Sequence, residues 1–194
     1  MPEAGARRRR GSPSRRSGRR ATARRASPKR PWRIVFLDLD GTLTDGLITF
    51  DGTGDQRHFS IRDGLALQWA RDLGVLPVVI SGRESRAAEL RMHDLGIEFY
   101  LGARDKVAIA ADVIGREGAT WEECVMVGDD LPDVPLLKRV GWAVAVSDAS
   151  PEVKAVADYV TRARPGHGAV REVMERVLRH NRLWHRVLER YEVG

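Results

Sequence analysis

An apolar run that ends in two acids is the feature that most restricts how this chain can fold. Residues 34–37 read Ile-Val-Phe-Leu, and Asp38, Leu39, Asp40 and Gly41 follow directly. A short apolar run of this kind is typical of a strand buried in a parallel sheet. Side chains two residues apart on an extended chain point to the same side, so both carboxylates lie together beyond the strand. In α/β sheets, catalytic and ligand-binding groups gather at this edge, although a turn that merely caps a strand has the same pattern.

Apolar runs alternate with helical patterns along the rest of the chain. The predicted strands are 34–37, 76–80, 97–101, 124–127 and 142–146, and the predicted helices between them lie near 64–73, 84–94, 105–116 and 133–138. A further helical stretch is predicted from about 168 to 190. This alternation predicts an α/β fold, namely a three-layer, doubly wound parallel sheet with helices on both faces.

Residues 47–60 interrupt this alternation. Two short β-prone pieces flank Asp51-Gly-Thr-Gly, a sequence that favours a hairpin turn, so a hairpin is expected to project after the first strand. The hairpin is too small to be a separate cap domain. We therefore expect one domain over 31–180 with a flap hairpin at about 47–60, a helical tail over 181–194 and an N-terminal tail over 1–30.

The basic charge of the chain is concentrated in this N-terminal tail. Residues 1–30 hold eleven Arg, one Lys and one acid, Glu3, so they carry +11; the whole chain carries +6, which leaves −5 for 31–194. The tail is rich in Arg, Ser, Gly and Ala without apolar periodicity, which predicts disorder. It fits an arm for nucleic acid, a solubilising extension, a start-site artefact or an organelle transit peptide. The negative charge of the remainder disfavours nucleic acid as a partner.

Cysteine content and hydropathy indicate the compartment. Cys124 is the only cysteine, so an intrachain disulfide is impossible, and its apolar surroundings predict a buried, unreactive thiol. This cysteine usage fits a reducing cytoplasm. No run approaches the roughly 18 apolar residues that a membrane span requires, and the N-terminus lacks the apolar stretch of a signal peptide. We expect a cytoplasmic protein with no membrane partner.

Polar groups with complementary chemistry follow successive predicted strands. In chain order they are Asp38 and Asp40, then Ser81, Gly82 and Arg83, then Lys106, and last Asp129, Asp130 and Asp133. A hydroxyl and free backbone N–H groups after a strand can bind phosphate, and a lysine at a helix start balances anionic charge. Carboxylates such as Asp38 and Asp129 suit a hard cation such as Mg²⁺. Each piece alone also has an ordinary structural explanation, as a turn, a solvated lysine or a helix cap, but together they predict one site.

These segments carry a family resemblance over about 140 residues. They are 38–46 (DLDGTLTDG), 59–64 (FSIRDG), 81–83 (SGR), 91 before 95–97 (LGI), 106, 128–133 (GDDLPD), 144–148 (VAVSD), 157–161 (ADYVT) and 166–173 (GHGAVREV). With them the chain resembles the haloacid dehalogenase superfamily of phosphatases. Within it, the chain is more closely similar to the small, capless 3-deoxy-D-manno-octulosonate 8-phosphate phosphatases.

The resemblance implies a mechanism. Asp38 would be the nucleophile that forms an aspartyl-phosphate, and Asp40 would be the general acid and base. Mg²⁺ would be held by Asp38, by the backbone carbonyl of Asp40 and by Asp129. Asp130 and Asp133 would support the site by orienting waters and the lysine rather than by binding metal.

The resemblance also implies how the substrate is bound. Ser81, Gly82 and Lys106 would bind the phosphoryl oxygens, with Lys106 also counted among the catalytic residues. The remaining substrate contacts implied are Ser60, Arg62, Asp63, Gly64, Arg83 and Arg91, together with Asp40. Arginine is the natural bidentate partner for the carboxylate of a sugar acid.

The implied activity is hydrolysis of 3-deoxy-D-manno-octulosonate (KDO) 8-phosphate to KDO and phosphate in lipopolysaccharide biosynthesis. The implied assembly is a homotetramer, in which the hairpin of one subunit packs at its neighbour's site. Ala66 and His167 depart from glycines common in the family, so substrate identity stays open. The alternatives are a phosphatase for a nonulosonate 9-phosphate, a nucleic-acid-end phosphatase and a non-catalytic partner domain.

Overall fold

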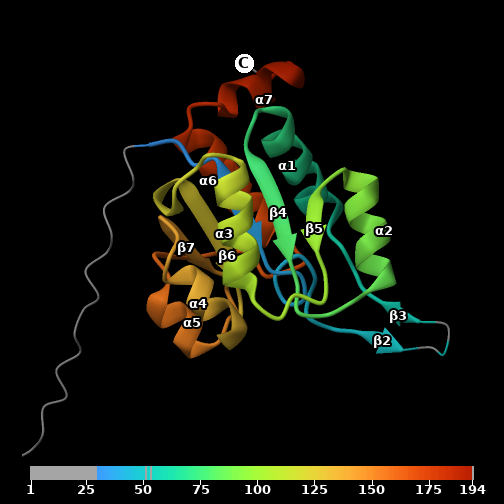
Figure 1. The fold of residues 1–194 in the computed structure, drawn as a ribbon. Helices are drawn as coiled ribbons and strands as arrows, with labels where there is room; N and C mark the ends of the chain where they lie inside the picture. Colours follow the sequence, from blue (N-terminus) through green and yellow to red (C-terminus); the bar gives the residue numbers. More distant parts are fainter. Residues whose placement is uncertain (1–29, 51, 53, 194) are drawn as a thin grey trace, which may run out of the picture.

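Six parallel strands form the central sheet of the computed structural model, which describes residues 30–50, 52 and 54–193 (Figure 1). The strands are β1 (Ile34–Leu37), β4 (Leu76–Ile80), β5 (Glu98–Tyr100), β6 (Cys124–Gly128), β7 (Trp142–Ala145) and β8 (Tyr159–Val160). Their order across the sheet is β5-β4-β1-β6-β7-β8, and every neighbouring pair is parallel. The predicted doubly wound parallel sheet is confirmed. The predicted disorder of the tail concerns 1–29, which lie outside the described residues.

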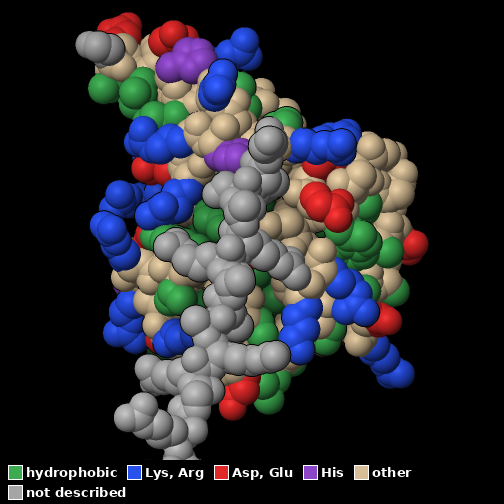
Figure 2. All heavy atoms as spheres, turned by 90° about the vertical axis from the view of Figure 1, so that its left-hand side faces the viewer, with side chains coloured by type: hydrophobic (Ala, Val, Ile, Leu, Met, Phe, Trp, Pro, Cys, Tyr) green, Lys and Arg blue, Asp and Glu red, His purple; other side chains and the backbone are tan. Residues whose placement is uncertain are grey.

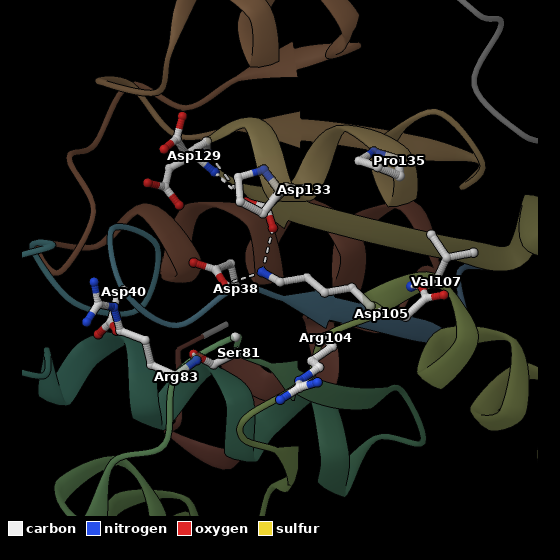
Figure 3. A pocket seen from close by; sticks show the side chains of 15 residues that line it. Asp38, Asp40, Ser81, Arg83, Arg104, Asp105, Val107, Asp129, Asp133 and Pro135 are labelled. Carbon is white, nitrogen blue, oxygen red and sulfur yellow. Dashed lines mark hydrogen bonds and ion pairs between the residues drawn. The ribbon is translucent and has the colours of Figure 1, made fainter.

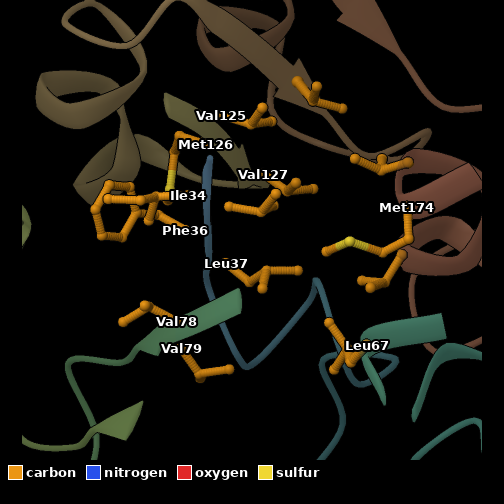
Figure 4. Packing of buried hydrophobic residues seen from close by; sticks show 14 of the residues in the cluster. Ile34, Phe36, Leu37, Leu67, Val78, Val79, Val125, Met126, Val127 and Met174 are labelled. Carbon is orange, nitrogen blue, oxygen red and sulfur yellow. The ribbon is translucent and has the colours of Figure 1, made fainter. Parts of the chain in front are cut away.

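The strands that precede the acidic residues lie at the centre of the sheet. Ile34, the first residue of β1, pairs with Leu76 of β4 on one side and with Cys124 of β6 on the other. All four residues of β1 and all five of β6 are buried, because helices cover both faces of the sheet. The apolar side chains of β1, β4 and β6 interdigitate with those of the covering helices (Figure 4). This packing fixes the position of Asp38 at the end of β1.

Helices cover the sheet on both sides. They are α1 (Ile61–Asp72), α2 (Arg86–Leu95), α3 (Lys106–Arg116), α4 (Val134–Leu137), α5 (Pro151–Val156), α6 (Ala169–His180) and α7 (Trp184–Arg190), with short 3₁₀ turns at Trp121–Glu123 and Leu131–Asp133. Right-handed crossovers put α1 and α2 on one face, where α6 packs against α1, and put α3, α4 and α5 on the other (Figure 1). Among the described residues, no helix combines the length and the apolar character that a membrane crossing requires.

Several predicted boundaries differ from the structure. The single helical stretch expected over 168–190 is two helices, because Arg182 adopts a left-handed backbone conformation (φ 59°) between them. The helix expected near 133–138 is only Val134–Leu137, preceded by a 3₁₀ turn that contains Pro132. Two elements were not predicted, namely α5 and the two-residue strand β8, which are too short to produce a recognisable apolar period.

The last helix packs onto the rest of the fold. Val187 of α7 is buried, and the ring of Trp184 lies 5.8 Å from that of Trp69 on α1. Tyr191, just after α7, accepts a 3.0 Å hydrogen bond from the Trp69 indole. The described part of this segment, 181–193, therefore contacts the helical layer, and the assignment of 181–194 as a separate tail stays a prediction.

The predicted hairpin is present beside the carboxyl edge of the sheet. Its strands are β2 (Thr49–Phe50) and β3 (Asp55–Gln56), which pair antiparallel and extend away from the main body (Figure 1). A bridge between Thr44 and Phe59 holds the base of the hairpin. Residues 51 and 53 of the predicted turn lie outside the described residues.

Candidate active site

A cavity of about 600 Å³ opens at the carboxyl edge of the sheet, where β1, β4 and β6 end and α3 begins. The predicted site residues that line it are Asp38, Asp40, Ser81, Gly82, Arg83, Lys106, Asp129, Asp130 and Asp133 (Figure 3). Because the strands are parallel and adjacent, their ends converge even though these residues are up to 95 positions apart in the chain. Arg104 also lines the cavity and was not predicted.

A buried lysine joins two of the carboxylates. Lys106 is the first residue of α3, and its side chain is only 9% exposed. Its Nζ donates to Asp38 Oδ1 and, at 2.7 Å, to Asp133 Oδ1 (Figure 3). Burial lowers the pKa of Lys106, but the charges of Asp38 and Asp133 outweigh this and raise it above its ordinary value. The lysine therefore remains a cation at the floor of the cavity.

Asp133 uses its two oxygens for different tasks. One accepts the hydrogen bond from Lys106, and the other accepts from the backbone N–H of Asp129 at 3.0 Å. The carboxylate is 2% exposed, so it cannot be reoriented without breaking these bonds. Asp133 thus contacts both the lysine and the loop that carries Asp129, and its supporting role stays a prediction. Asp130 is exposed at the rim of the cavity.

Three carboxylates are crowded closely enough to hold a cation. Asp38, Asp129 and Asp133 each have an oxygen within 4.8 Å of those of the other two. Burial and the nearby charges of Asp38 and Asp133 raise the pKa of Asp129 to about 8. Burial and Asp133 raise the pKa of Asp38 to about 6, against the opposing effect of Lys106. One lysine does not neutralise this cluster, so an all-oxygen donor set with excess negative charge fits a hard divalent cation such as Mg²⁺.

The turn after β1 is built to bring its backbone next to Asp129. Gly41 has φ +84°, and a Cβ at this position would overlap the Asp129 carboxylate. Thr42 donates a hydrogen bond to Asp129 Oδ1 at 3.4 Å. The glycine in the motif is therefore required both by its left-handed conformation and by the close approach of the carboxylate.

The end of β4 contributes the second wall of the cavity. Ser81 is 2% exposed, and its hydroxyl accepts a 3.2 Å hydrogen bond from the backbone N–H of Arg83. Gly82 and Arg83 are exposed on the cavity side. Ser81 and Gly82 thus line the same cavity as Lys106, and phosphate binding by this segment stays a prediction.

Asp40 has a partner that sequence reasoning missed. Arg57, from the chain just after β3, donates from Nε to Asp40 Oδ1 at 2.6 Å and from Nη2 to Asp40 Oδ2 at 3.1 Å. The exposure of residues 55–59 alternates, with Arg57 and Phe59 more buried than their neighbours. The strand period that predicted the hairpin could have identified Arg57 as inward-facing.

The other predicted substrate contacts do not line this cavity within one chain. Ser60 caps α1 by accepting from the N–H of Asp63, and Asp63 accepts from the backbone N–H groups of Gly168 (3.1 Å) and Arg171 (2.6 Å). Arg62 is exposed. Ser60 and Asp63 thus have structural partners at the starts of α1 and α6, and the role of all three residues in substrate binding stays a prediction.

Gly64 and Arg91 form a packed pair away from the cavity. A Cβ at Gly64 would overlap the Arg91 guanidinium, so the glycine makes room for that side chain. Arg91 itself donates to Asp94 at 2.7 Å on α2. Its contact with substrate also stays a prediction.

Known proteins are similar to this chain both in sequence and in fold. A family model described as haloacid dehalogenase-like hydrolase matches residues 104–173. The 3-deoxy-D-manno-octulosonate 8-phosphate phosphatase KdsC of Escherichia coli K12 is 39% identical over 148 residues, which are 75% of this chain and 79% of that protein. This chain belongs to the haloacid dehalogenase-like hydrolases.

Solved structures agree with this assignment. The Moraxella catarrhalis 3-deoxy-D-manno-octulosonate 8-phosphate phosphatase, in complex with magnesium, phosphate and KDO, is 31% identical, with a TM-score of 0.79 over 82% of this chain and 92% of that one. The cobalt-bound Haemophilus influenzae enzyme is 35% identical, with a TM-score of 0.75 over 78% and 90%. The cavity described above therefore belongs to a fold that this chain shares with solved phosphatases.

Proposed function

We propose that the protein is a Mg²⁺-dependent phosphatase that hydrolyses KDO 8-phosphate to KDO and inorganic phosphate. The observation that carries the proposal is the position of Asp38, which lies at the end of β1, next to Lys106 and beside the Asp129 carboxylate in one cavity. The similarity to KdsC, and to a relative that binds magnesium, phosphate and KDO, supports this substrate. The pathway would be the synthesis of lipopolysaccharide precursors.

The carboxylates of Asp38 and Asp129 and the backbone carbonyl of Asp40 would hold Mg²⁺. When bound, the cation offsets the negative charge of these carboxylates and of the phosphoryl group. Asp133 is already engaged with Lys106 and the 129–130 backbone, so it acts as a support. Asp130 lies at the rim, where it can orient water.

The first chemical step is transfer of the phosphoryl group to Asp38. Its carboxylate oxygen attacks phosphorus, the bond to the sugar oxygen breaks, and an aspartyl-phosphate forms. Asp40 gives its proton to the departing alkoxide. Lys106 remains charged throughout and stabilises the negative oxygens near Asp38.

The second step regenerates the nucleophile. Asp40, now ionised, takes a proton from water, and that water attacks phosphorus as the bond to Asp38 breaks. Inorganic phosphate is released and Asp38 is again a free carboxylate. Ser81, the Gly82 N–H and Lys106 would bind the phosphoryl oxygens in both steps, and Arg83, which also lines the cavity, would contact the rest of the substrate.

A homotetramer and a cytoplasmic location complete the proposal. Leu47 and Phe50 of the hairpin region are 69% and 75% exposed, and Ile61 just beyond it is 80% exposed. Exposed apolar side chains grouped in this way favour burial against another subunit. Light scattering on the purified protein tests the tetramer. The single thiol of Cys124 is buried, which is compatible with a reducing compartment.

For the described residues, the face in Figure 2 gives no specific support to a nucleic-acid substrate. On the face in Figure 2, Lys and Arg side chains lie scattered among apolar and acidic ones. A phosphate-binding track would need basic side chains in a continuous row. The function of residues 1–30 stays open between the alternatives given above.

Phosphate release from a panel of substrates tests the proposed function. The panel contains KDO 8-phosphate, nonulosonate 9-phosphates and a 5′-phosphorylated oligonucleotide, each with Mg²⁺, and the Asp38→Asn protein is the blank. A strong preference for KDO 8-phosphate that the variant loses supports the proposal. Turnover of a nonulosonate phosphate alone would retain the mechanism and reject the substrate. No turnover by a folded, Mg²⁺-binding protein would reject both and favour a non-catalytic partner domain.

A further inference from the structure

Arg57 is buried although it belongs to a projecting hairpin. Its side chain is 1% exposed, and the two nitrogens facing Asp40 form the parallel pair of bonds, at 2.6 and 3.1 Å, described above. An arginine fork bound to both oxygens of a carboxylate fixes the plane of that carboxylate as well as its position. Ordinary surface ion pairs leave the guanidinium solvated, which is not the case here.

The third nitrogen of Arg57 is anchored on the opposite side. Nη1 donates to Ser85 Oγ at 2.6 Å and also contacts the carboxylate of Asp55 in β3. Ser85 donates in turn to Asp55 Oδ2 at 2.7 Å and accepts from the N–H of Ala88 at the start of α2. The guanidinium is therefore held by the hairpin and by the α2 terminus, so it is itself a rigid reference point.

The network lies between two adjoining cavities. Asp40 lines the catalytic cavity, whereas Arg57 and Asp55 line a second cavity of about 450 Å³ under the hairpin. Arg83 lines both. The hairpin thus reaches the catalytic cavity through the Arg57–Asp40 pair.

We propose that Arg57 is a positioning residue for Asp40, which ties the orientation of the acid–base carboxylate to the hairpin. The inference rests on the proposed function, because it requires Asp40 to transfer protons. Asp40 must deliver a proton to the leaving oxygen and later accept one from water, and both transfers depend on a fixed carboxylate orientation. Because Arg57 donates to both oxygens of Asp40, its loss would leave the carboxylate free to rotate out of alignment.

Steady-state kinetics of Arg57→Met and Arg57→Lys with KDO 8-phosphate test the proposal. For Arg57→Met we expect kcat to fall about 10- to 100-fold with KM changed less than threefold, since alignment and not binding is lost. Arg57→Lys keeps the charge but not the fork, so we expect a partial loss. Arg86→Met is the matched control, because Arg86 is exposed and pairs with Glu89 one turn further along the same helix, α2, so its loss is expected to leave kcat unchanged.

A double-mutant cycle separates positioning from a general structural effect. In the Asp40→Asn background, Arg57→Met should lower kcat by less than twofold further, because the group that it positions is already inactive. An equal additional loss in that background, or a higher KM with unchanged kcat, would overturn the proposal. If Arg57→Met lacks a cooperative melting transition, the same cycle is measured with Arg57→Lys instead. Full activity of Arg57→Lys would contradict a role for the two parallel hydrogen bonds of the guanidinium.

Rapid-mixing kinetics with p-nitrophenyl phosphate provide a second readout. Nitrophenolate leaves without a proton, so Arg57→Met should still release one equivalent in a burst and then turn over slowly, because water attack needs Asp40. A slow first turnover would contradict positioning. This substrate also tests Arg57 independently of the proposed sugar phosphate. If the wild-type protein hydrolyses p-nitrophenyl phosphate but no sugar phosphate, the proposed substrate is rejected, and the burst still measures the role of Arg57.

Discussion

The two edges of the sheet are built from opposite kinds of side chain. At the carboxyl edge, Asp38, Asp129 and Asp133 crowd around one lysine, and burial raises the pKa of the first two. At the amino edge, Trp32 lies between Trp142 (ring centroids 4.5 Å apart) and the imidazole ring of His180 (3.9 Å). One edge holds like charges together and the other holds stacked rings.

The difference separates function from stability. Crowded carboxylates oppose folding unless they are protonated or neutralised by a cation, which is why such clusters persist at sites that need them. The rings at the amino edge stabilise the fold and join Trp32, two residues before β1, to the start of β7 and the end of α6. The fold can therefore retain an unfavourable catalytic edge because the opposite edge is well packed.

The largest effect is expected from Lys106→Met at the carboxyl edge. Removing the cation leaves Asp38 and Asp133 without their shared partner, so we expect phosphatase activity to fall about 10²- to 10³-fold. Breaking a buried ion pair from one side also lowers the free energy of unfolding by about 3–5 kcal/mol. Phosphate release and urea unfolding measure the two losses. A variant with near wild-type kcat would show that the lysine is only structural.

Trp32→Ala at the amino edge should cost a similar amount of stability without the loss of activity. Truncating a buried indole lowers the free energy of unfolding by about 3–5 kcal/mol. Because Trp32 lies at the edge opposite the cavity, kcat measured below the melting transition should stay within about threefold of wild type. A kcat loss comparable with that of Lys106→Met would mean that the two edges are mechanically coupled, and the comparison would fail.

The carboxylate cluster at the carboxyl edge should make the stability of the metal-free protein depend on pH. The pKa values of Asp38 (about 6) and Asp129 (about 8) are raised, so the folded protein binds more protons than the unfolded chain between pH 4 and 8. Its stability therefore falls as pH rises through this window, by up to about 1.4 kcal/mol per pH unit and group. Mg²⁺ competes with those protons, so its stabilising effect should grow with pH.

Melting curves at pH 5 to 8, with EDTA or with excess MgCl₂, measure this prediction. The difference in melting temperature between the two conditions should widen as pH rises. Asp129→Asn should flatten the pH dependence of the EDTA series, whereas Trp32→Ala should lower the whole series without changing its shape. A difference that narrows toward pH 8 would contradict the assigned pKa shifts.

How much the sequence alone predicts also differs between local and distant interactions. The residues at strand ends could be predicted, because a buried strand followed by a polar turn is a local pattern and parallel packing then brings the ends together. Two contacts could not be predicted, namely that of Arg57 with Asp40 and that of Asp63 with the backbone at the start of α6. Both depend on how distant segments of the chain fold back on each other. The break at Arg182 was hidden because Leu183 and Val187 continue the apolar stripe beyond it.

The smallest predicted effect concerns Asn181, whose side chain completes the amino edge. Its amide accepts from Trp32 N–H at 2.9 Å and donates to the Trp32 carbonyl at 2.7 Å, so it pairs both backbone groups before β1. Asn181→Ala should lower the free energy of unfolding by about 1–2 kcal/mol, because two backbone groups lose their partners. Asn181→Asp keeps the acceptor and loses the donor, so its free energy of unfolding should lie between those of the wild type and Asn181→Ala. Urea unfolding measures the stability of each variant, and a phosphate-release assay measures its kcat. A change in kcat at unchanged stability would show that the amino edge influences catalysis, which contradicts its purely structural role.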